Sequence, residues 1–296
     1  MKDSWKIRAV RAALRATQAV STDAAARLSD RLFCTPPSSA VPAAVQDLFT
    51  RAERDSLVVD GERVAVWRWG TGPAIALVHG WGSRAARLAV HVEPLLAEGF
   101  SVVAFDAPAH GESEGRLGSG IQTARALLAV AATTPLHGVV AHSLGAAATL
   151  IALREGLQLR RAVFIAPPSD IHVYLDRFAA MFGVRDDVIA AMMRRTEQRL
   201  RFRWDDLDLV GMAAGVRGVE LLLIHDHGDE EVAWDCGAAI VGAWPGATLI
   251  TTDGLGHNRI ARDPAVVARA ARFHAAGIRD ATGEPQLAGP LSAGAD

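Results

Sequence analysis

The 296-residue chain has little cysteine, little net charge and no long apolar run, and each shortage excludes a class of protein. Its only two cysteines, Cys34 and Cys236, stand far apart and outside any metal-ligand spacing. They provide no disulfide framework, which favours a reducing compartment, and we expect a cytoplasmic protein. A formal net charge of −2 gives no electrostatic basis for binding nucleic acid.

No segment is expected to insert stably in a membrane. The longest nearly charge-free run, Gly138 to Leu153, divides into a strand and a helix and is not a membrane span. Met1 to Arg31 carries seven basic residues against three acidic ones, but it lacks the apolar core and cleavage site of a signal peptide. This segment is either a membrane-surface helix with a basic face or a helix packed on the domain or frayed in solvent, and we favour the second.

Half of the residues are hydrophobic and 22% are charged, which is typical of a globular protein with a sizeable core. After a proline-containing linker at residues 34–39, short apolar runs alternate with helical segments. Most of the apolar runs are unbroken, as in strands buried on both faces of a parallel sheet. The predicted strands are Leu57–Val59 and Val64–Trp67, which form a hairpin, then Ala74–Val78, Ser101–Phe105, Gly138–Ala141, Ala162–Ile165, Val219–Ile224 and Ala247–Ile250. The predicted helices between and after them are 87–98, 119–132, 146–156, 234–243 and 264–276.

This alternation predicts an α/β fold with a doubly wound, mostly parallel sheet, which binds ligands beyond the carboxyl ends of its strands. Residues 1–50 are predicted to be an N-terminal helical extension and linker, and residues 51–276 the α/β domain. Within that domain, residues 169–215 are helical with no strand signal, which predicts a lid insertion above the strand ends. Residues 277–296, rich in Gly, Ala and Pro, are predicted to be a disordered tail.

The segment Ala141-His142-Ser143-Leu144-Gly145 joins an apolar run to an alanine-rich helical segment. A strand, a sharp turn with a serine at its tip and a helix make up a nucleophile elbow. The residues two before and two after the serine must be small, because the strand and the helix approach each other closely there. We therefore predict that Ser143 is a nucleophile.

A serine nucleophile needs a base and a group that orients the base. His257 follows the last predicted strand in a glycine-rich loop, which places its imidazole at the same sheet edge as Ser143. Asp229 follows the strand Val219–Ile224 and stands in a D-x-x-V pattern, so we prefer it to Asp226 as the orienting acid.

Attack on a carbonyl also requires hydrogen-bond donors for the oxyanion that develops. One predicted donor is the backbone N–H of Leu144, directly after the nucleophile. The other is the amide of Trp81, because Gly80 and Gly82 on either side let it turn toward the site. His79 is expected to stabilise this loop by hydrogen bonding.

Five motifs in one order resemble those of the α/β-hydrolase-fold serine hydrolases, and the chain is similar to their bacterial esterase-like members over about Leu57 to Ala276. The H-G-W loop, the D-x-P-G-H-G-x-S motif, the nucleophile elbow, the H-x-x-x-D-x-x-V motif and the G-H motif match, in that order, residues 79–81, 106–113, 141–145, 225–232 and 256–257. Two positions depart from the pattern, since Ala109 and Ala141 replace glycine. Both residues are small, so a slight backbone adjustment is expected there.

The resemblance implies a triad of Ser143, His257 and Asp229, an oxyanion hole at Trp81 and Leu144, and an acyl-enzyme intermediate. It implies a carboxylic ester as the small-molecule substrate, with thioesters or small lipidic esters as further candidates, and no cofactor or metal. No substrate-binding residue and no oligomeric state can be predicted. Alternatives are an acyltransferase on the same triad and a non-catalytic receptor or binding protein with this fold.

A metal-dependent hydrolase is a further alternative, because His225-x-His227-x-Asp229 mimics part of a two-metal site. Such sites require another histidine directly after the aspartate, and Glu230 stands there. A metal site would also leave Ser143, His257 and the oxyanion loop without a role. We therefore prefer the serine hydrolase.

Overall fold

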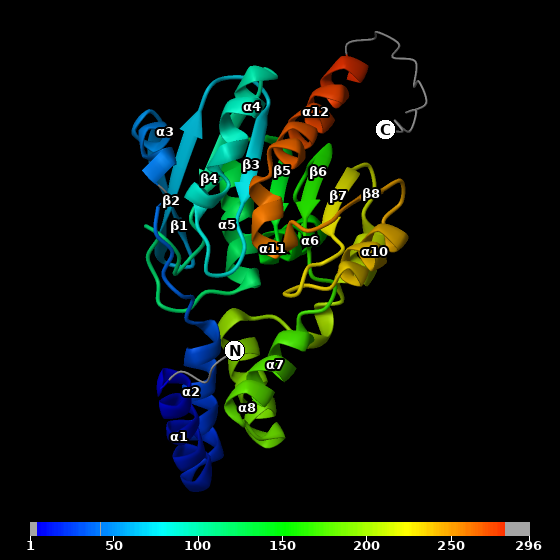
Figure 1. Ribbon diagram of the computed structural model, residues 1–296. Coiled ribbons are helices and arrows are strands. Elements are labelled where there is room, and N and C mark those ends of the chain that lie inside the picture. The colour runs from blue at the N-terminus through cyan, green and yellow to red at the C-terminus, as the bar shows by residue number, and fades with distance from the viewer. Residues whose placement is uncertain (1–4, 42, 282–296) are drawn as a thin grey trace.

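The computed structural model describes residues 5–41 and 43–281, and it confirms the predicted fold class. Within these residues, eight strands form one sheet with helices on both faces (Figure 1). The sheet order is β1-β2-β4-β3-β5-β6-β7-β8, and only the β1–β2 and β2–β4 pairs are antiparallel. The strands are β1 (Glu53–Val59), β2 (Glu62–Trp69), β3 (Ala74–Val78), β4 (Ser101–Phe105), β5 (Leu136–His142), β6 (Arg161–Ile165), β7 (Glu220–Asp226) and β8 (Thr248–Thr252).

The hairpin of β1 and β2 turns at Asp60 and Gly61, whose φ angles are 51° and 85°. Two residues with positive φ make the tight turn whose twist matches that of the flanking strands, and Asp-Gly is a preferred sequence for it. Because β2 runs antiparallel to β4, its first residue, Glu62, lies at the edge where the parallel strands end. This places the hairpin turn at the same edge of the sheet as Ser143.

Helices on each face of the sheet bury an apolar core, as the unbroken strand patterns predict. One face carries α4 (Val92–Ala97) and α12 (Pro264–Ala281), and the other carries α5 (Gly120–Thr133), α6 (Leu144–Arg154) and α10 (Trp234–Ala243). The helix predicted over 87–98 is wrong in its first half, where two 3₁₀ turns precede α4. A helix starting at residue 87 would place Pro94 in its interior, where proline removes a hydrogen bond and clashes with the preceding turn.

The predicted extension at 1–50 and the predicted lid at 169–215 lie side by side. Figure 1 shows α1 (Trp5–Val20) and α2 (Thr22–Cys34) next to α7 (His172–Phe182) and α8 (Asp186–Leu200), beyond one end of the sheet. The remaining helices of these two segments are α3 (Gln46–Thr50) and α9 (Leu209–Gly215). We call α1, α2, α7 and α8 together the cap. The first helices therefore pack on the rest of the chain, as favoured above.

The ends of the chain are described only in part. The predicted tail begins inside a helix, because α12 continues to Ala281, five residues past its predicted end. Residues 1–4 of the extension and 282–296 of the tail lie outside the described residues. In the part that is described, no helix is long and apolar enough to cross a bilayer.

A buried ion pair ties α2 to α8. Asp30, only 4% exposed, accepts a hydrogen bond from Thr196 Oγ1 at 3.0 Å and pairs with Arg199 Nη2 at 3.0 Å. Burial, together with the charge of Asp30, raises the pKa of the neighbouring Cys34 thiol to about 12, so this cysteine stays protonated. Since a buried carboxylate is tolerated only when it is paired, Asp30 fixes how the two halves of the cap meet.

We expect Asp30→Ala to lower the free energy of unfolding by about 2–3 kcal/mol, because it leaves Arg199 and Thr196 without their shared partner. Urea unfolding at neutral pH measures the change. Asp23→Ala in the same helix is the matched control, since it removes only an exposed pair with Arg27 and should cost about 0.5 kcal/mol or less. Equal losses in the two variants would contradict the role of Asp30.

Candidate active site

Ser143 lies at the tip of a strained turn between β5 and α6. Its φ and ψ are 53° and −123°, a conformation that costs a non-glycine residue about 1–2 kcal/mol. A Cβ at Gly145 would lie 2.2 Å from the carbonyl oxygen of Val78, so only glycine fits there. Ala141, the departure from the motif, has its methyl group fully buried in the core. The turn thus requires glycine two residues after the serine and accepts alanine two residues before it.

The structure brings Ser143, His257 and Asp229 into one hydrogen-bonded chain. His257 Nε2 lies 3.0 Å from Ser143 Oγ, and His257 Nδ1 lies 2.8 Å from Asp229 Oδ2. Ser143 follows β5, Asp229 follows β7, and His257 follows β8 in the short helix α11 (Gly256–Arg259). Because these strands are parallel, their carboxyl ends meet at one sheet edge, and residues far apart in sequence become neighbours.

Of the two candidate acids, only Asp229 contacts His257. Asp226 instead accepts hydrogen bonds from Thr252 Oγ1 at 2.8 Å and from the Leu255 amide at 2.9 Å, which fixes the loop that leads to His257. The second oxygen of Asp229 accepts the amides of Glu231 and Val232, both at 2.9 Å. Burial by itself would raise the pKa of Asp229, but hydrogen bonds from His225 and His257 hold it well below its usual value. Asp229 therefore stays charged beside His257.

Two histidines support this chain in ways that the sequence did not reveal. His142 Nε2 donates to the carbonyl oxygen of His257 at 2.9 Å, with the rings 4.8 Å apart. Burial lowers the pKa of His142 to about 3, so the ring stays neutral. His225 Nε2 donates to the Val232 carbonyl at 3.0 Å and lies 3.4 Å from Asp229. One histidine thus holds the base and the other holds the acid loop.

The loop of His79, Gly80 and Trp81 lies against the serine. A Cβ at Gly80 would come within 3.0 Å of Ser143 Cβ, so the loop backbone packs directly on the nucleophile turn. Among the described residues, nothing accepts a hydrogen bond from the amides of Trp81 and Leu144. Leu144 is also the first residue of α6, where the helix dipole favours negative charge. The two predicted oxyanion donors therefore have N–H groups that remain available to a ligand.

Neutral histidines fix the loops around Ser143. His79 Nε2 accepts the Ala107 amide at 2.9 Å, and His110 Nε2 accepts the Gly82 amide at 3.1 Å. A ring nitrogen that accepts an amide hydrogen carries no proton, so both rings are neutral. Burial lowers the pKa of each histidine to about 4. His79 thus stabilises the loop, as predicted.

The second departure from the motif, Ala109, has a φ of 65°, in the left-handed region that favours glycine. Its segment is held by the buried carboxylate of Asp106, which accepts the amides of Ala85 and Glu112, both at 2.7 Å. Ala109 therefore occupies a backbone conformation that glycine adopts more readily than alanine.

The residues of the metal alternative do not converge. His225 and Asp229 are buried, whereas the His227 side chain is 70% exposed, with its Nδ1 3.9 Å from Asp253. Successive odd-numbered residues in the segment 225–229 thus face different surroundings. Across residues 5–41 and 43–281, no three His, Cys, Asp or Glu side chains are placed to share a metal ion.

The chain belongs to the alpha/beta hydrolase family, whose model matches residues 75–270. This confirms the resemblance inferred from the five motifs. No curated protein sequence matches the chain.

Solved structures share the fold at low sequence identity. An esterase of Pyrococcus furiosus, Pf2001, is 22% identical to this chain with a TM-score of 0.61. The match covers 81% of this chain and 97% of the esterase chain. A bromoperoxidase from Bacillus anthracis is 16% identical with a TM-score of 0.58, covering 75% and 99% of the two chains. Est816, an enzyme that degrades N-acyl homoserine lactones, is 14% identical with a TM-score of 0.59, covering 74% and 99%. At these identities the likeness establishes the fold alone.

The neutral loop histidines predict that stability falls as the pH is lowered from about 6.5 to 4. Unfolding returns each histidine to its ordinary pKa of about 6.5, so the unfolded chain binds more protons than the folded one in this range. The pKa of His110, lowered to about 4, adds up to one proton to this difference, or about 1.4 kcal/mol per pH unit.

His110→Gln should therefore show a shallower dependence of unfolding free energy on pH, measured by urea unfolding between pH 7 and 5. Glutamine can still accept the Gly82 amide. The control is His227→Gln, which changes an exposed ring and should keep the parent slope. An unchanged slope in His110→Gln would show that this histidine is not held neutral.

Proposed function

We propose that this protein is a serine hydrolase that cleaves carboxylic esters, with thioesters and small lipidic esters as related substrates. The observation that carries the proposal is the chain Ser143 Oγ–His257 Nε2 at 3.0 Å and His257 Nδ1–Asp229 Oδ2 at 2.8 Å. These distances suit proton transfer from the hydroxyl to a histidine that a carboxylate orients.

The reaction would proceed in two halves. Ser143 Oγ attacks the substrate carbonyl while His257 Nε2 takes the hydroxyl proton and then gives it to the leaving alcohol. The charged Asp229 stabilises the imidazolium in between. Water then attacks the acyl-serine, with His257 again acting as base, and the acid product leaves.

The oxyanion of each tetrahedral intermediate would be held by the amides of Trp81 and Leu144. A donor of this kind is worth about 2.7–4 kcal/mol of barrier when it is aimed in advance. Gly80 lets the loop approach the serine, and the His110 ring 5.2 Å from the Trp81 ring supports that loop. The loop that carries the Trp81 amide is thus held against the turn that carries the Leu144 amide.

The similarity to an esterase and to a lactone-degrading enzyme is consistent with an ester substrate, since a lactone is a cyclic ester. A segment of the predicted lid also contacts the acid loop, because Arg177 in α7 donates to the Glu231 carbonyl at 2.7 Å. We therefore assign residues 169–215 to a lid over the site, joined by the N-terminal helices.

Ser143→Ala should lower kcat/KM for p-nitrophenyl butyrate by about 10⁴-fold or more, because it removes the attacking group. Asp229→Asn should lower kcat by about 10⁴-fold, because the histidine loses the partner that sets its tautomer. Initial rates at neutral pH, with circular dichroism to verify folding, measure both effects.

The matched control is Ser56→Ala, an exposed serine of β1, which should keep the parent rate. Hydrolysis that persists in Ser143→Ala and is lost with EDTA would overturn the proposal in favour of a metal enzyme. An intact protein that binds esters but turns none over would instead favour a receptor.

A further inference from the structure

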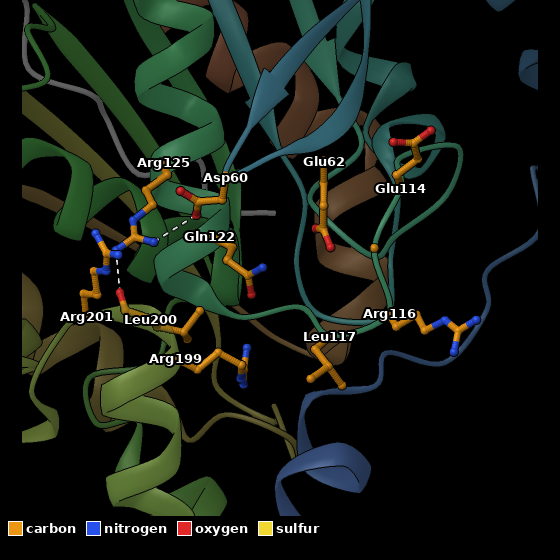
Figure 2. Close-up of a pocket in the computed structure, with 11 residues that line it drawn as sticks. Asp60, Glu62, Glu114, Arg116, Leu117, Gln122, Arg125, Arg199, Leu200 and Arg201 are labelled. Carbon is orange, nitrogen blue, oxygen red and sulfur yellow. Dashed lines mark hydrogen bonds and ion pairs between the residues drawn. The ribbon is translucent and has the colours of Figure 1, made fainter.

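A cavity lies beside the proposed active site, between the cap and the sheet. It measures about 990 Å³ and is lined by the β1–β2 turn, the loop at 114–117, the start of α5 and the end of α8. Figure 2 shows Glu62, Gln122 and Arg199 converging on it from β2, α5 and α8. The mechanism proposed above uses none of these side chains.

The cavity adjoins the nucleophile turn across the first residues of α5. A Cβ at Gly120, between Leu117 and Gln122 of the lining, would come within 3.4 Å of the Leu144 side chain. Its loop is also in contact with the site, since a Cβ at Gly118 would lie 3.1 Å from the His110 ring. In the sheet order, β2 is three strands from β5, so the two strands lie roughly 14 Å apart across the sheet at about 4.8 Å per strand.

Unused hydrogen-bond donors point into the cavity. Gln122 is 93% buried and its Oε1 accepts from Ser119 Oγ at 3.0 Å, but its Nε2 has no partner among the described residues. Arg199 uses Nη2 for Asp30 and Cys34, which leaves its Nε and Nη1 hydrogens available. The Gln122 amide lines the cavity, so a ligand with acceptor oxygens could take a hydrogen bond from it.

The charges of the lining leave an excess of positive charge. Asp60 pairs with Arg125 at 2.9 Å, and Glu114 pairs with Arg63 at 3.4 Å. In the described structure, Arg116 and Arg201 line the two sides of the cavity with no ion-pair partner (Figure 2).

Glu62 is the remaining acid of the lining, and its Oε2 is buried without a partner. Burial, with the nearby charges of Asp60 and Glu114, raises its pKa. The environment thus disfavours a negative charge on the protein at this point. The unpaired guanidinium groups of Arg116 and Arg201 stand at opposite ends of the lining, and Glu62 and Gln122 lie between them (Figure 2).

We propose that this cavity binds the anionic end, a carboxylate or a phosphate, of a long ester substrate whose carbonyl lies at Ser143. The proposal rests on the proposed function, because it specifies the substrate class of the same site. Guanidinium groups bind such anions through charge-assisted hydrogen bonds, and the Gln122 amide would add one more.

Three p-nitrophenyl esters that differ only at the far end test this: an ω-carboxylate, an ω-phosphate and a neutral ω-hydroxyl dodecanoate. An extended dodecanoyl chain is about as long as the separation of β2 and β5 across the sheet. We expect kcat/KM to be about tenfold higher for at least one anionic ester than for the neutral one, as for one or two charge-assisted contacts. Whichever of the two anionic esters has the higher kcat/KM shows whether the cavity prefers a carboxylate or a phosphate.

Two variants should move this ratio in opposite directions. Arg116→Ala combined with Arg201→Ala should bring it toward one, whereas Glu62→Gln should raise it about threefold by removing a negative charge and adding a donor. The matched control is Arg203→Ala, an exposed arginine paired with Asp205, which should keep the parent ratio. A ratio near one in the parent, or the same ratio in all variants, would overturn the subsite while ester hydrolysis by Ser143 stands.

Binding gives an answer that is independent of turnover. Calorimetry with Ser143→Ala should detect tighter binding of monomethyl dodecanedioate than of methyl ω-hydroxydodecanoate, and Glu62→Gln in that background should widen the difference. Equal affinities for the neutral ester, this carboxylate and the corresponding methyl ω-phosphate ester would overturn the subsite. If no variant hydrolyses any ester, the proposed function fails, and the calorimetric difference alone decides whether the cavity binds anions.

Discussion

The turn at Ser143 is the constraint on which the rest of the site depends. A φ of 53° accompanies the 3.0 Å approach of the hydroxyl to His257, and the close backbone at Gly80 and Gly145 leaves no room for larger side chains there. The strain is held by the sheet, since the Ser143 amide donates to the Ile165 carbonyl at 2.9 Å. Strain of about 1–2 kcal/mol persists only where the surrounding structure fixes it, and such positions concentrate at functional sites. The packing of β3, β5 and β6 therefore determines the direction of the Ser143 hydroxyl.

Around this turn, polar groups are buried to hold loops in place. The carboxylates of Asp106 and Asp226 each accept backbone amides, and the rings of His79 and His110 do the same as neutral acceptors. Each holds a loop in one conformation, so the conformational entropy of ordering that loop is lost on folding and not on substrate binding. The site is thus arranged before a substrate binds. The cap, closed on itself through Asp30, adds a charged cavity to one side of this rigid edge.

Much of the fold and the central residues could be predicted because their signals are local. Unbroken apolar runs gave β3 and β4 their bounds, Asp60-Gly61 defined the hairpin turn, and the glycine after Ser143 indicated the sharp turn. The packing of the first helices on the lid could not be predicted, since it joins segments more than 150 residues apart by contacts such as Arg185 to Gln18. The contact of His142 with His257 depends on the turn geometry itself. For α4, Pro94 is the local signal that the helix begins only shortly before it.

Labelling by a fluorophosphonate, followed by peptide mapping, tests the central claim most directly, because the probe reports an activated serine without any assumption about the substrate. The account predicts one adduct, on the peptide that contains Ser143, and labelling slowed by at least about 100-fold in Asp229→Asn, where the base loses its orienting partner. An adduct on a different serine, or labelling of Ser143 at the same rate without the Asp229 carboxylate, would contradict it.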